Sequence, residues 1–412
     1  MCLINETPDR TRLTSVLLYG YLKLTWEGPM KYLSIITLIL SSFYTSLFAQ
    51  ELPPVSDDEV DIVEKLPIHY PDSWIYVSKT GFPTDGRIMI VDVADKTKPY
   101  KGAASTGYLG DFAVNNELGE FYVSETFYSR ASRGKRSDMI TIFDQATLMP
   151  KGEIALEEGK RFLVLPMKGK FRLINNKKWA MVANYTPAAS VTIVDLENKK
   201  LLNEIPIPGC NLAFPLGNRG FATLCGYGEV ISVNLDENGQ SIAEHQSDVF
   251  NDLDNDPHFE KFTRVGEVMY LPTYEGNITP IDLSGDQAKV GETWSLVSDA
   301  EREQGWRPGG WQVITSDSSG NLYVLMHDKG YNGSHKDPGK EVWVFDPKSN
   351  SRTARHTLND VAWSILVTKE KEPHLVTVMM DDENLNVYDA ASGDFIRKIK
   401  VGTFVPTLYT SE

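Results

Sequence analysis

The chain has 412 residues, of which 41% are hydrophobic, and it carries a formal net charge of -15 at pH 7. This composition supplies enough apolar residues for a packed core and differs from the composition of disordered chains. The negative charge argues against a nucleic-acid partner, whose phosphates it would repel, whereas a basic or neutral protein partner is compatible with it.

The first 49 residues have the pattern of a leader and signal peptide. After Met30, Lys31 precedes an apolar run that ends at Ala49, which gives the basic, apolar and small-residue regions of a signal peptide in order. We therefore expect translation to start at Met30 and the mature chain to be exported to the periplasm. A retained membrane anchor is the alternative, although the run is short for a spanning helix. Residues 50–72, rich in acids and proline at their start, are expected to form an extended N-terminal arm.

A short pattern repeats through residues 73–412. Each copy is an apolar strand that ends on Asp or Asn, in most cases before a polar turn, and the copies end at Asp92, Asp144, Asp195, Asn234, Asp282, Asp346 and Asp389. About seven copies, roughly 40 to 65 residues apart, match the length of a four-stranded blade. Because one small sheet buries too little surface to be stable alone, the pattern predicts an all-β, seven-bladed β-propeller.

Strands are predicted in pairs along this repeat. The predicted strands after 73–78 are 119–124 with 139–143, 179–184 with 190–194, 220–224 with 230–233, 268–272 with 278–282, 321–326 with 342–345, and 374–379 with 385–388. The Asp that ends a strand is expected to accept hydrogen bonds from amides of the following turn rather than to act in catalysis. Residues 299–304 form the one short helical pattern.

Two segments interrupt the repeat and are predicted to be inserted loops. The second, 328–340, follows His327 and contains His335. The first, 124–138, is basic in an otherwise acidic protein and contains Arg130, Arg133, Lys135 and Arg136. Because long loops on a rigid scaffold commonly contact partners, both segments are candidate contact sites, with solvated loops as the alternative.

Cys210 and Cys225 are the cysteines that remain if translation starts at Met30, since Cys2 then lies outside the protein. They are separated by 15 positions across a turn at 215–218, so a disulfide can join neighbouring strands in an oxidising compartment. Two buried free thiols are the alternative. A metal site is less favoured because no histidine lies nearby in the sequence.

The motifs that would indicate catalysis or metal binding are incomplete. Residues 251–256 alternate carboxylates as a calcium loop does, but Pro257 replaces the required Gly and Thr263 replaces the bidentate Glu, so an acidic turn is the preferred interpretation. The seven histidines have no metal-ligand spacing, and neither a nucleophile elbow nor a phosphate-binding loop is present. The residues alone predict a periplasmic propeller with no catalytic or metal site.

Several separated stretches resemble the heavy (large) subunit of the tryptophan tryptophylquinone amine dehydrogenases. These stretches are 125–144, 186–195, 208–210 with 225–228, and 305–311. The resemblance extends over nearly the whole mature chain, from about Trp74 onward. Within the family, 326–336 and 133–138 are more similar to the aromatic amine dehydrogenase branch than to the methylamine dehydrogenase branch.

The resemblance implies a seven-bladed propeller, a disulfide between Cys210 and Cys225, and a heterotetramer of two heavy and two light chains. It implies that the light chain carries the tryptophan tryptophylquinone cofactor and the catalytic base, so that this chain holds neither. The complex would oxidise primary amines, aromatic or aliphatic, to aldehydes and pass electrons to a small copper protein of the azurin or amicyanin type. Phe82 falls near the family's channel-lining phenylalanine, with a turn aromatic as the alternative.

A further set of residues is predicted to form either the light-chain interface or structural motifs. They are Arg130, Arg133, Arg136, Asp138, Trp306, Arg307, Trp311, His327 and His335. Trp306 and Trp311 are interpreted as packing or light-chain contacts, because the family pattern places the quinone on the other chain. The rival functions are a binding scaffold that has lost its light chain and a stand-alone propeller enzyme, the latter disfavoured because no catalytic residues converge.

Overall fold

The middle strands of the sheets are apolar on both faces. The computed structural model describes residues 65–80 and 85–410, and in it β9 (Trp179–Asn184) and β10 (Ser190–Asp195) are buried at every position. A strand that alternates apolar and polar residues covers a core on one face, whereas a continuous apolar strand needs cover on both. These strands therefore belong to sheets that are stacked between neighbouring sheets.

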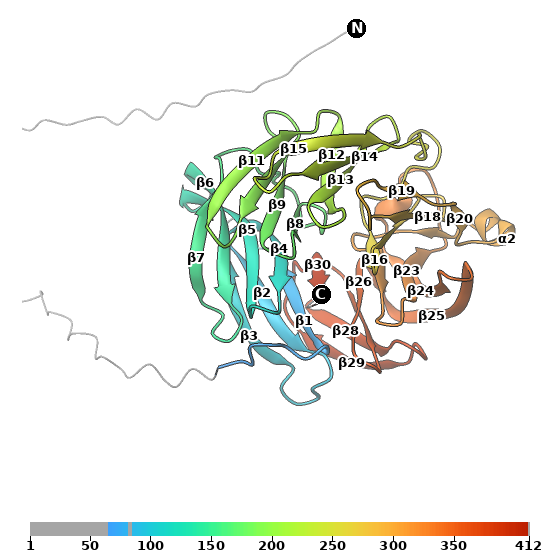
Figure 1. Cartoon of the computed structure of the whole chain (residues 1–412). Coiled ribbons are helices and arrows are strands. Elements are labelled where there is room, and N and C mark those ends of the chain that lie inside the picture. The colour runs from blue at the N-terminus through green and yellow to red at the C-terminus, as the bar shows by residue number, and fades with distance from the viewer. Residues whose placement is uncertain (1–64, 81–84, 411–412) are drawn as a thin grey trace, which may run out of the picture. The chain divides into compact units, whose positions relative to one another are not determined.

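Within the described residues, seven antiparallel sheets surround a central axis (Figure 1). From the innermost to the outermost strand, the first four sheets are β30 (Thr407–Tyr409), β1 (Trp74–Lys79), β2 (Gly86–Asp92) and β3 (Tyr100–Thr106); β4 (Tyr108–Asn115), β5 (Glu120–Arg130), β6 (Arg133–Asp144) and β7 (Pro150–Ala155); β8 (Phe171–Ile174), β9, β10 and β11 (Lys200–Pro206); and β12 (Cys210–Pro215), β13 (Gly220–Cys225), β14 (Val230–Leu235) and β15 (Ser241–Gln246). The fifth sheet has β16 (Thr263–Val265), β17 (Val268–Pro272), β18 (Asn277–Asp282) and β19 (Lys289–Val290), with β20 (Trp294–Ser295) also paired to β18. The sixth has β21 (Arg307–Pro308) and β22 (Ile314–Ser316), both paired to β23 (Leu322–His327), then β24 (Gly339–Asp346) and β25 (Ser351–Ala362), and the seventh has β26 (Ser364–Val367), β27 (His374–Val378), β28 (Asn384–Asp389) and β29 (Phe395–Lys400).

The hydrophobic core is divided among the seven gaps between adjacent sheets. Each of seven buried clusters takes its residues from two neighbouring sheets, and one of them joins β1 and β2 to β27 and β28. The seventh gap closes the ring, so every sheet packs on two others. The predicted seven-bladed propeller is confirmed.

The ring closes through a strand that the sequence analysis did not predict. β30, the last strand of the described residues, pairs antiparallel with β1, the first of them, through Tyr76 with Tyr409 and Ser78 with Thr407. Leu408 and Tyr409 are buried, at 0% and 4% exposed. Burial of these side chains and the strand pairing together hold the two ends of the described chain in one sheet.

All six Asp residues that end the repeats cap the following turn, as predicted. Their carboxylates accept hydrogen bonds from turn amides at 2.8–3.0 Å at Asp92, Asp144, Asp195, Asp282, Asp346 and Asp389. The seventh copy has Asn234 in place of Asp, and Asn234 lies inside β14. There Asp236 takes the capping role and accepts from the amides of Asn238 and Gln240 at 2.8 Å.

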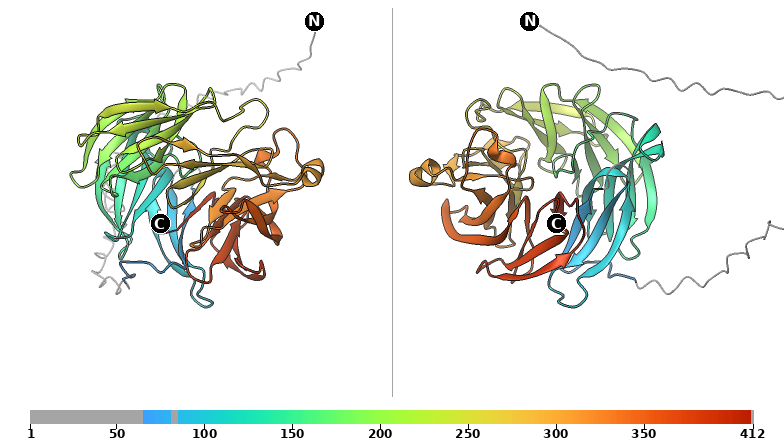
Figure 2. Two further views of the ribbon diagram at one scale, coloured as in Figure 1. Left: turned by 45° about the vertical axis from the view of Figure 1, so that its right-hand side comes forward. Right: turned by 180° about the vertical axis from the view of Figure 1, so that it is seen from behind.

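The first inserted loop that was predicted, 124–138, is not a loop. β5 and β6 continue through it as a paired ribbon, in which Thr126 lies opposite Asp138 and Arg130 lies opposite Arg133. The polar and basic side chains suggested a loop, but they occupy a two-stranded extension that has no sheet on which to pack. The ribbon projects from the ring (Figure 2). The second predicted loop is observed over residues 328–338, with a 3-10 turn at Ser334–Lys336, and β24 begins at Gly339.

The helix predicted at 299–304 is confirmed as α2 (Asp299–Glu303), which has a capping box between Ser298 and Glu301. No helix among residues 65–80 and 85–410 is long and apolar enough to cross a membrane. The predictions for 1–49, and those for 50–64, concern residues outside the described ranges.

Candidate functional site

The predicted contact residues gather at one end of the ring. In a four-stranded antiparallel sheet, the loop between the two middle strands lies at the end where the innermost strand begins. The β5–β6 turn, the β23–β24 loop with His335, and the segment that leads into β22 with Trp311 all meet this condition. We call this the entry end of the ring, and the opposite end, where the innermost strands finish, the exit end.

The β5–β6 ribbon presents basic side chains at the entry end. Arg130 and Arg133 are exposed at its tip, where Ala131 and Gly134 have positive φ values of 56° and 96°. Arg136 is held closer to the ring, because its guanidinium donates to Asp138 at 2.9 Å and to the carbonyl of Arg161 at 2.9 Å. The two exposed arginines are therefore available to a partner, whereas Arg136 is committed to the ribbon.

Asp138 anchors the base of the ribbon. Its carboxylate is 1% exposed and accepts from the Thr126 hydroxyl at 2.5 Å, from Arg136 and from the amide of Gly159 at 2.9 Å. Charged acceptors with several donors are among the strongest hydrogen-bonding groups in proteins. The structure thus gives Asp138 a positioning role within this chain.

A buried charge cluster that the sequence analysis missed lies beneath the ribbon. Asp111 bonds Arg161 at 2.8 Å and Lys170 at 3.0 Å, and all three side chains are at most 2% exposed. Arg161 also donates to Ser124 and Thr126 at 3.0 Å, which ties it to β5. Burial, only partly offset by Asp111, lowers the pKa of Lys170 to about 8. Arg161 and Lys170 lie 50 or more positions after Asp111 in the sequence, so no local motif signals the cluster.

The two tryptophans of the 305–311 stretch have different surroundings. Trp306 is 6% exposed and packs in the core against Trp343, with ring centres 5.1 Å apart. Trp311 stacks on Trp363 at 5.4 Å and donates its ring N–H to the carbonyl of Pro166 at 3.1 Å. Arg307, between them, pairs with Glu275 at 2.7 Å. Trp311 is therefore the one placed at a wall of the entry end.

His327 and His335 have different surroundings. His327 is 4% exposed at the end of β23, and its Nε2 has no hydrogen-bond partner within the described part of the chain. His335 stacks on Tyr274 with ring centres 4.1 Å apart. Burial lowers the pKa of both imidazoles, so both are neutral at pH 7.

A cavity of about 570 Å³ opens at the entry end, with His335 and Trp311 in its wall. Its aromatic lining is Phe162, Tyr185, His258, Phe259, Tyr274, Trp311 and His335, and Cys225 and Lys261 also line it. Phe162 stacks on Tyr185 at 4.7 Å. Burial lowers the pKa of Lys261 to about 8, and its ammonium lies 4.1 Å from the centre of the Trp311 ring.

Large apolar side chains surround this cavity on the surface. Tyr227 is 86% exposed in the β13–β14 turn, and Val249 is 69% exposed in the segment before β16. The other exposed members at the entry end are Phe127, Tyr185, Leu253 and Tyr331. Tyr227, Val249 and Leu253 line one surface hollow, and grouped exposed apolar side chains often mark a protein interface.

The predicted disulfide is confirmed, and the alternative of two free thiols is wrong. Cys210 and Cys225 lie opposite each other in β12 and β13 and are bonded. The acidic segment 251–256 is a turn in which Asp252 accepts from the amides of Asp254 and Asn255 at 3.2 and 3.1 Å. No group of three or more potential metal ligands occurs in the described ranges. Phe82, the predicted channel residue, lies outside them.

The sequence matches the family model described as methylamine dehydrogenase heavy chain over residues 75–411. It is 28% identical to the methylamine dehydrogenase heavy chain of Methylorubrum extorquens over 369 residues, which cover 88% of each chain. It is 29% identical to that of Paracoccus versutus, over 72% of this chain and 70% of the relative.

Solved structures with low sequence identity share the fold. The periplasmic gluconolactonase of Pseudomonas aeruginosa aligns with a TM-score of 0.56 at 14% identity, over 82% of this chain and 99% of the other. A putative 6-phosphogluconolactonase from Bacteroides fragilis aligns with a TM-score of 0.53 at 13% identity, over 83% and 99%. At this identity the likeness describes the propeller alone.

Proposed function

The chain belongs to the methylamine dehydrogenase heavy chain family, and from this premise we propose that it is the non-catalytic heavy subunit of a quinoprotein amine dehydrogenase, with the entry end as its docking surface for the light subunit. Membership places the chain in a family of amine-oxidising oxidoreductases and implies association with a light subunit. The proposal adds the docking surface for the light subunit, the quinone cofactor on that subunit, and the amine and copper protein with which the complex would react.

The observation that supports the docking surface is the coincidence of three features at the entry end. Part of each stretch that resembles the family lies there, together with the 570 Å³ aromatic cavity and the exposed side chains around Tyr227. Interfaces between permanent subunits are rich in aromatic and apolar residues at their centre, and arginine is enriched in them. Arg130 and Arg133 would then contact the light subunit at the edge of the same surface.

The reactive group in this proposal is tryptophan tryptophylquinone on the light subunit, which when bound there accepts two electrons from a primary amine and yields an aldehyde. Apolar walls such as Trp311 and Phe162 would exclude water from the joint site, and exclusion of water strengthens electrostatic interactions inside it.

The remaining expectations are proposals that rest on the resemblance. They are export to the periplasm, a heterotetramer of two heavy and two light chains, and electron transfer to a small copper protein of the azurin or amicyanin type. The relatives named above are methylamine dehydrogenase heavy chains, whereas residues 326–336 and 133–138 are more similar to the aromatic branch. We therefore propose a primary amine as substrate, with the aromatic class as the narrower hypothesis. A binding scaffold without a light chain is the rival function.

Purification from the native source tests the division of labour. We expect a small second subunit to co-purify and to carry the quinone absorbance, while the separated heavy chain neither absorbs as a quinone nor oxidises methylamine or phenethylamine. Activity or quinone absorbance in the isolated heavy chain would refute the proposal. Co-purification of no second subunit would favour the scaffold.

Surface variants test the docking end. Tyr227→Ser should weaken retention of the light subunit at least tenfold, because it removes an exposed aromatic side chain at the proposed interface. Tyr100→Ser is the matched control, since Tyr100 is 52% exposed on β3, an outermost strand. Equal retention by both variants would remove the entry end as the docking surface.

In the assembled enzyme, Phe82→Ala should change the ranking of amines by length, and an unchanged ranking would remove Phe82 from the channel.

A further inference from the structure

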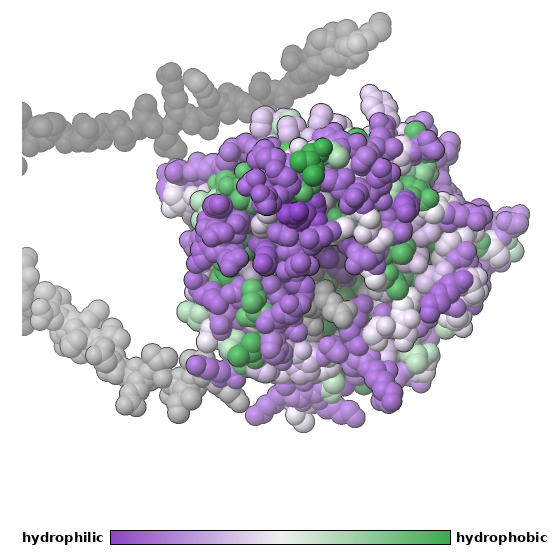
Figure 3. Space-filling model, in the orientation of Figure 1, coloured by the Kyte–Doolittle hydropathy of each residue, from purple (hydrophilic) through white to green (hydrophobic). Residues whose placement is uncertain are grey.

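A second cavity, of about 810 Å³, lies at the exit end of the ring. Most of its lining residues lie within or after the innermost strands β8, β16 and β22, and Lys168 and Phe262, just before β8 and β16, reach it from the side of the entry cavity. The face shown in Figure 3 is hollowed near the ring axis and is mostly hydrophilic there. Nothing proposed above uses this cavity.

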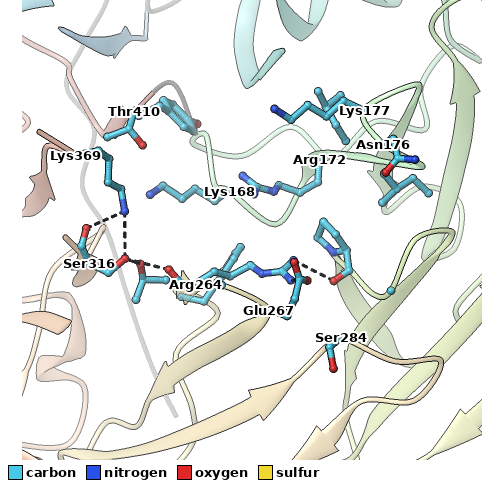
Figure 4. Close-up of a pocket in the computed structure, with 18 of the residues that line it drawn as sticks. Lys168, Arg172, Asn176, Lys177, Arg264, Glu267, Ser284, Ser316, Lys369 and Thr410 are labelled. Atoms are coloured by element: carbon cyan, nitrogen blue, oxygen red, sulfur yellow. Dashed lines mark hydrogen bonds and ion pairs between the residues drawn. The ribbon is translucent and has the colours of Figure 1, made fainter. Parts of the chain in front are cut away.

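The lining of the exit cavity is strongly cationic. Figure 4 shows Lys168, Arg172 and Lys369 with their charged ends in the same space. Among the described residues that line it, the cations are Lys168, Arg172, Lys177, Arg264 and Lys369, and Glu267 is the one carboxylate. The cations come from three different sheets of a protein whose formal net charge is -15. This local positive charge is opposite in sign to the net charge of the molecule.

Two of these cations have little compensation from the protein. Lys168 has no hydrogen bond or ion pair among the described residues, and the Nε of Arg172 is buried without a partner. The other three have partners: Lys177 pairs with Glu117 at 3.5 Å, Arg264 pairs with Glu267, and Lys369 donates to the carbonyl of Ser316 at 3.0 Å. Like charges confined together without counter-charge destabilise a fold, so their persistence indicates a ligand that supplies negative charge.

We propose that the exit cavity binds a small polyanion, a molecule with two or more phosphate or carboxylate charges, between Lys168, Arg172 and Lys369. Arginine presents several N–H donors in one plane, which matches the geometry of carboxylate and phosphate, and lysine adds point charge. A volume of about 810 Å³ lies within the range of small-molecule sites and exceeds what one phosphate ion fills. The site is enclosed by the ring, and this favours a small molecule over a polymer.

The protonation behaviour of Lys168 agrees with this assignment. Burial, with Arg172 and Lys369 as further causes, lowers the pKa of Lys168 to about 7. Burial also lowers the pKa of Arg172 to about 10, with Arg264 as a second cause. Among the described residues, Lys177 of the β8–β9 turn, Tyr409 of β30 and Glu267 of the β16–β17 turn are the other titratable groups that face the cavity. An anion among these groups would favour their charged forms and remove part of the repulsion.

Isothermal titration of the full chain tests the proposal, with citrate and inorganic phosphate as separate probes at constant ionic strength. At least one probe should bind with a Kd below about 1 mM, and the stronger probe shows which of the two oxyanion chemistries the site prefers. Lys168→Gln should weaken binding by roughly 10- to 100-fold, as expected for loss of one charged hydrogen bond. Lys348→Gln is the matched control, since Lys348 is exposed on the β24–β25 turn.

Thermal unfolding keeps the test valid if a variant folds poorly. Without anion, Lys168→Gln should unfold at the same or a higher temperature than the parent chain, because it removes a partly buried charge that has no partner among the described residues. Absence of binding by both probes, or equal affinity in the parent and Lys168→Gln chains, would overturn the proposal. Equal stabilisation by chloride at the same ionic strength would also overturn it, because it would show screening rather than a site.

Discussion

At the scale of a single residue, Glu125 is a buried titratable group at the entry end. Its side chain is 1% exposed on β5, and the amide of Gly107 donates to its carboxylate. Burial is the main cause that raises the pKa of Glu125 to about 7. The group therefore carries a proton in part of the neutral range, directly beneath the ribbon that holds Arg130 and Arg133.

The stability of the protein should depend on pH through Glu125. Between pH 4.5, the ordinary pKa, and about 7, the folded state holds a proton that the unfolded state has lost. The free energy of unfolding therefore falls as pH rises through this window, by about 3 kcal/mol for this group. Glu125→Gln cannot titrate, so this variant should be more stable than the parent above pH 7 and should lose less stability between pH 5 and 7.5.

Urea unfolding at several pH values measures this difference. Glu244→Gln serves as the control, because Glu244 is exposed on β15 and its replacement should leave the pH dependence of the parent unchanged. If Glu125→Gln and the parent lose stability in parallel between pH 5 and 7.5, the carboxyl group of Glu125 does not titrate in this range. The predicted contribution of Glu125 to the pH dependence is then wrong.

At the scale of the elements, the sequence predicted the middle strands of the sheets far better than the outer ones. β9 and β17 begin and end where the apolar runs predict, because both faces of these strands are buried. The innermost strands β16 and β22 have three residues each, too few to show a period. Outermost strands such as β15 are mostly exposed, so their polar residues resemble a loop.

The disulfide is the element-scale feature with the clearest effect on stability. It closes a loop with a sequence separation of 15 between β12 and β13, and such a loop contributes roughly 3 kcal/mol through the entropy of the unfolded chain. The double variant Cys210→Ser, Cys225→Ser should therefore unfold at a temperature lower by roughly 5 °C, as differential scanning calorimetry would measure.

Reduction provides the control for this variant. A reducing agent should lower the unfolding temperature of the parent to that of the double variant and leave the double variant unchanged. An unfolding temperature of the double variant equal to that of the oxidised parent would show that the bond contributes nothing, which would contradict the expectation.

At the scale of the whole molecule, ring closure creates both ends of the protein. The repeat predicted the ring, and the family resemblance indicated residues that now lie at the entry end. The exit cavity was not predicted, because Lys168, Arg264 and Lys369 are about 100 residues apart in the sequence and meet only when the innermost strands surround one axis. The cluster of Asp111, Arg161 and Lys170 was missed for the same reason. Distant contacts of this kind leave no local pattern.

The last prediction concerns closure of the ring by β30. Removal of residues 407–412 deletes β30, exposes the edge of β1 and takes Leu408 and Tyr409 out of two buried clusters. Two buried side chains at about 2 kcal/mol each, with the lost strand pairing, give a destabilisation of roughly 5 kcal/mol. The chain that ends at Pro406 should unfold at a much lower temperature, and an open ring should lose both the light subunit and the anion. Removal of residues 411–412 alone is the control, because it keeps every pair between β30 and β1. Calorimetry that shows the same unfolding temperature for the chain ending at Pro406 and for the control would contradict closure by β30.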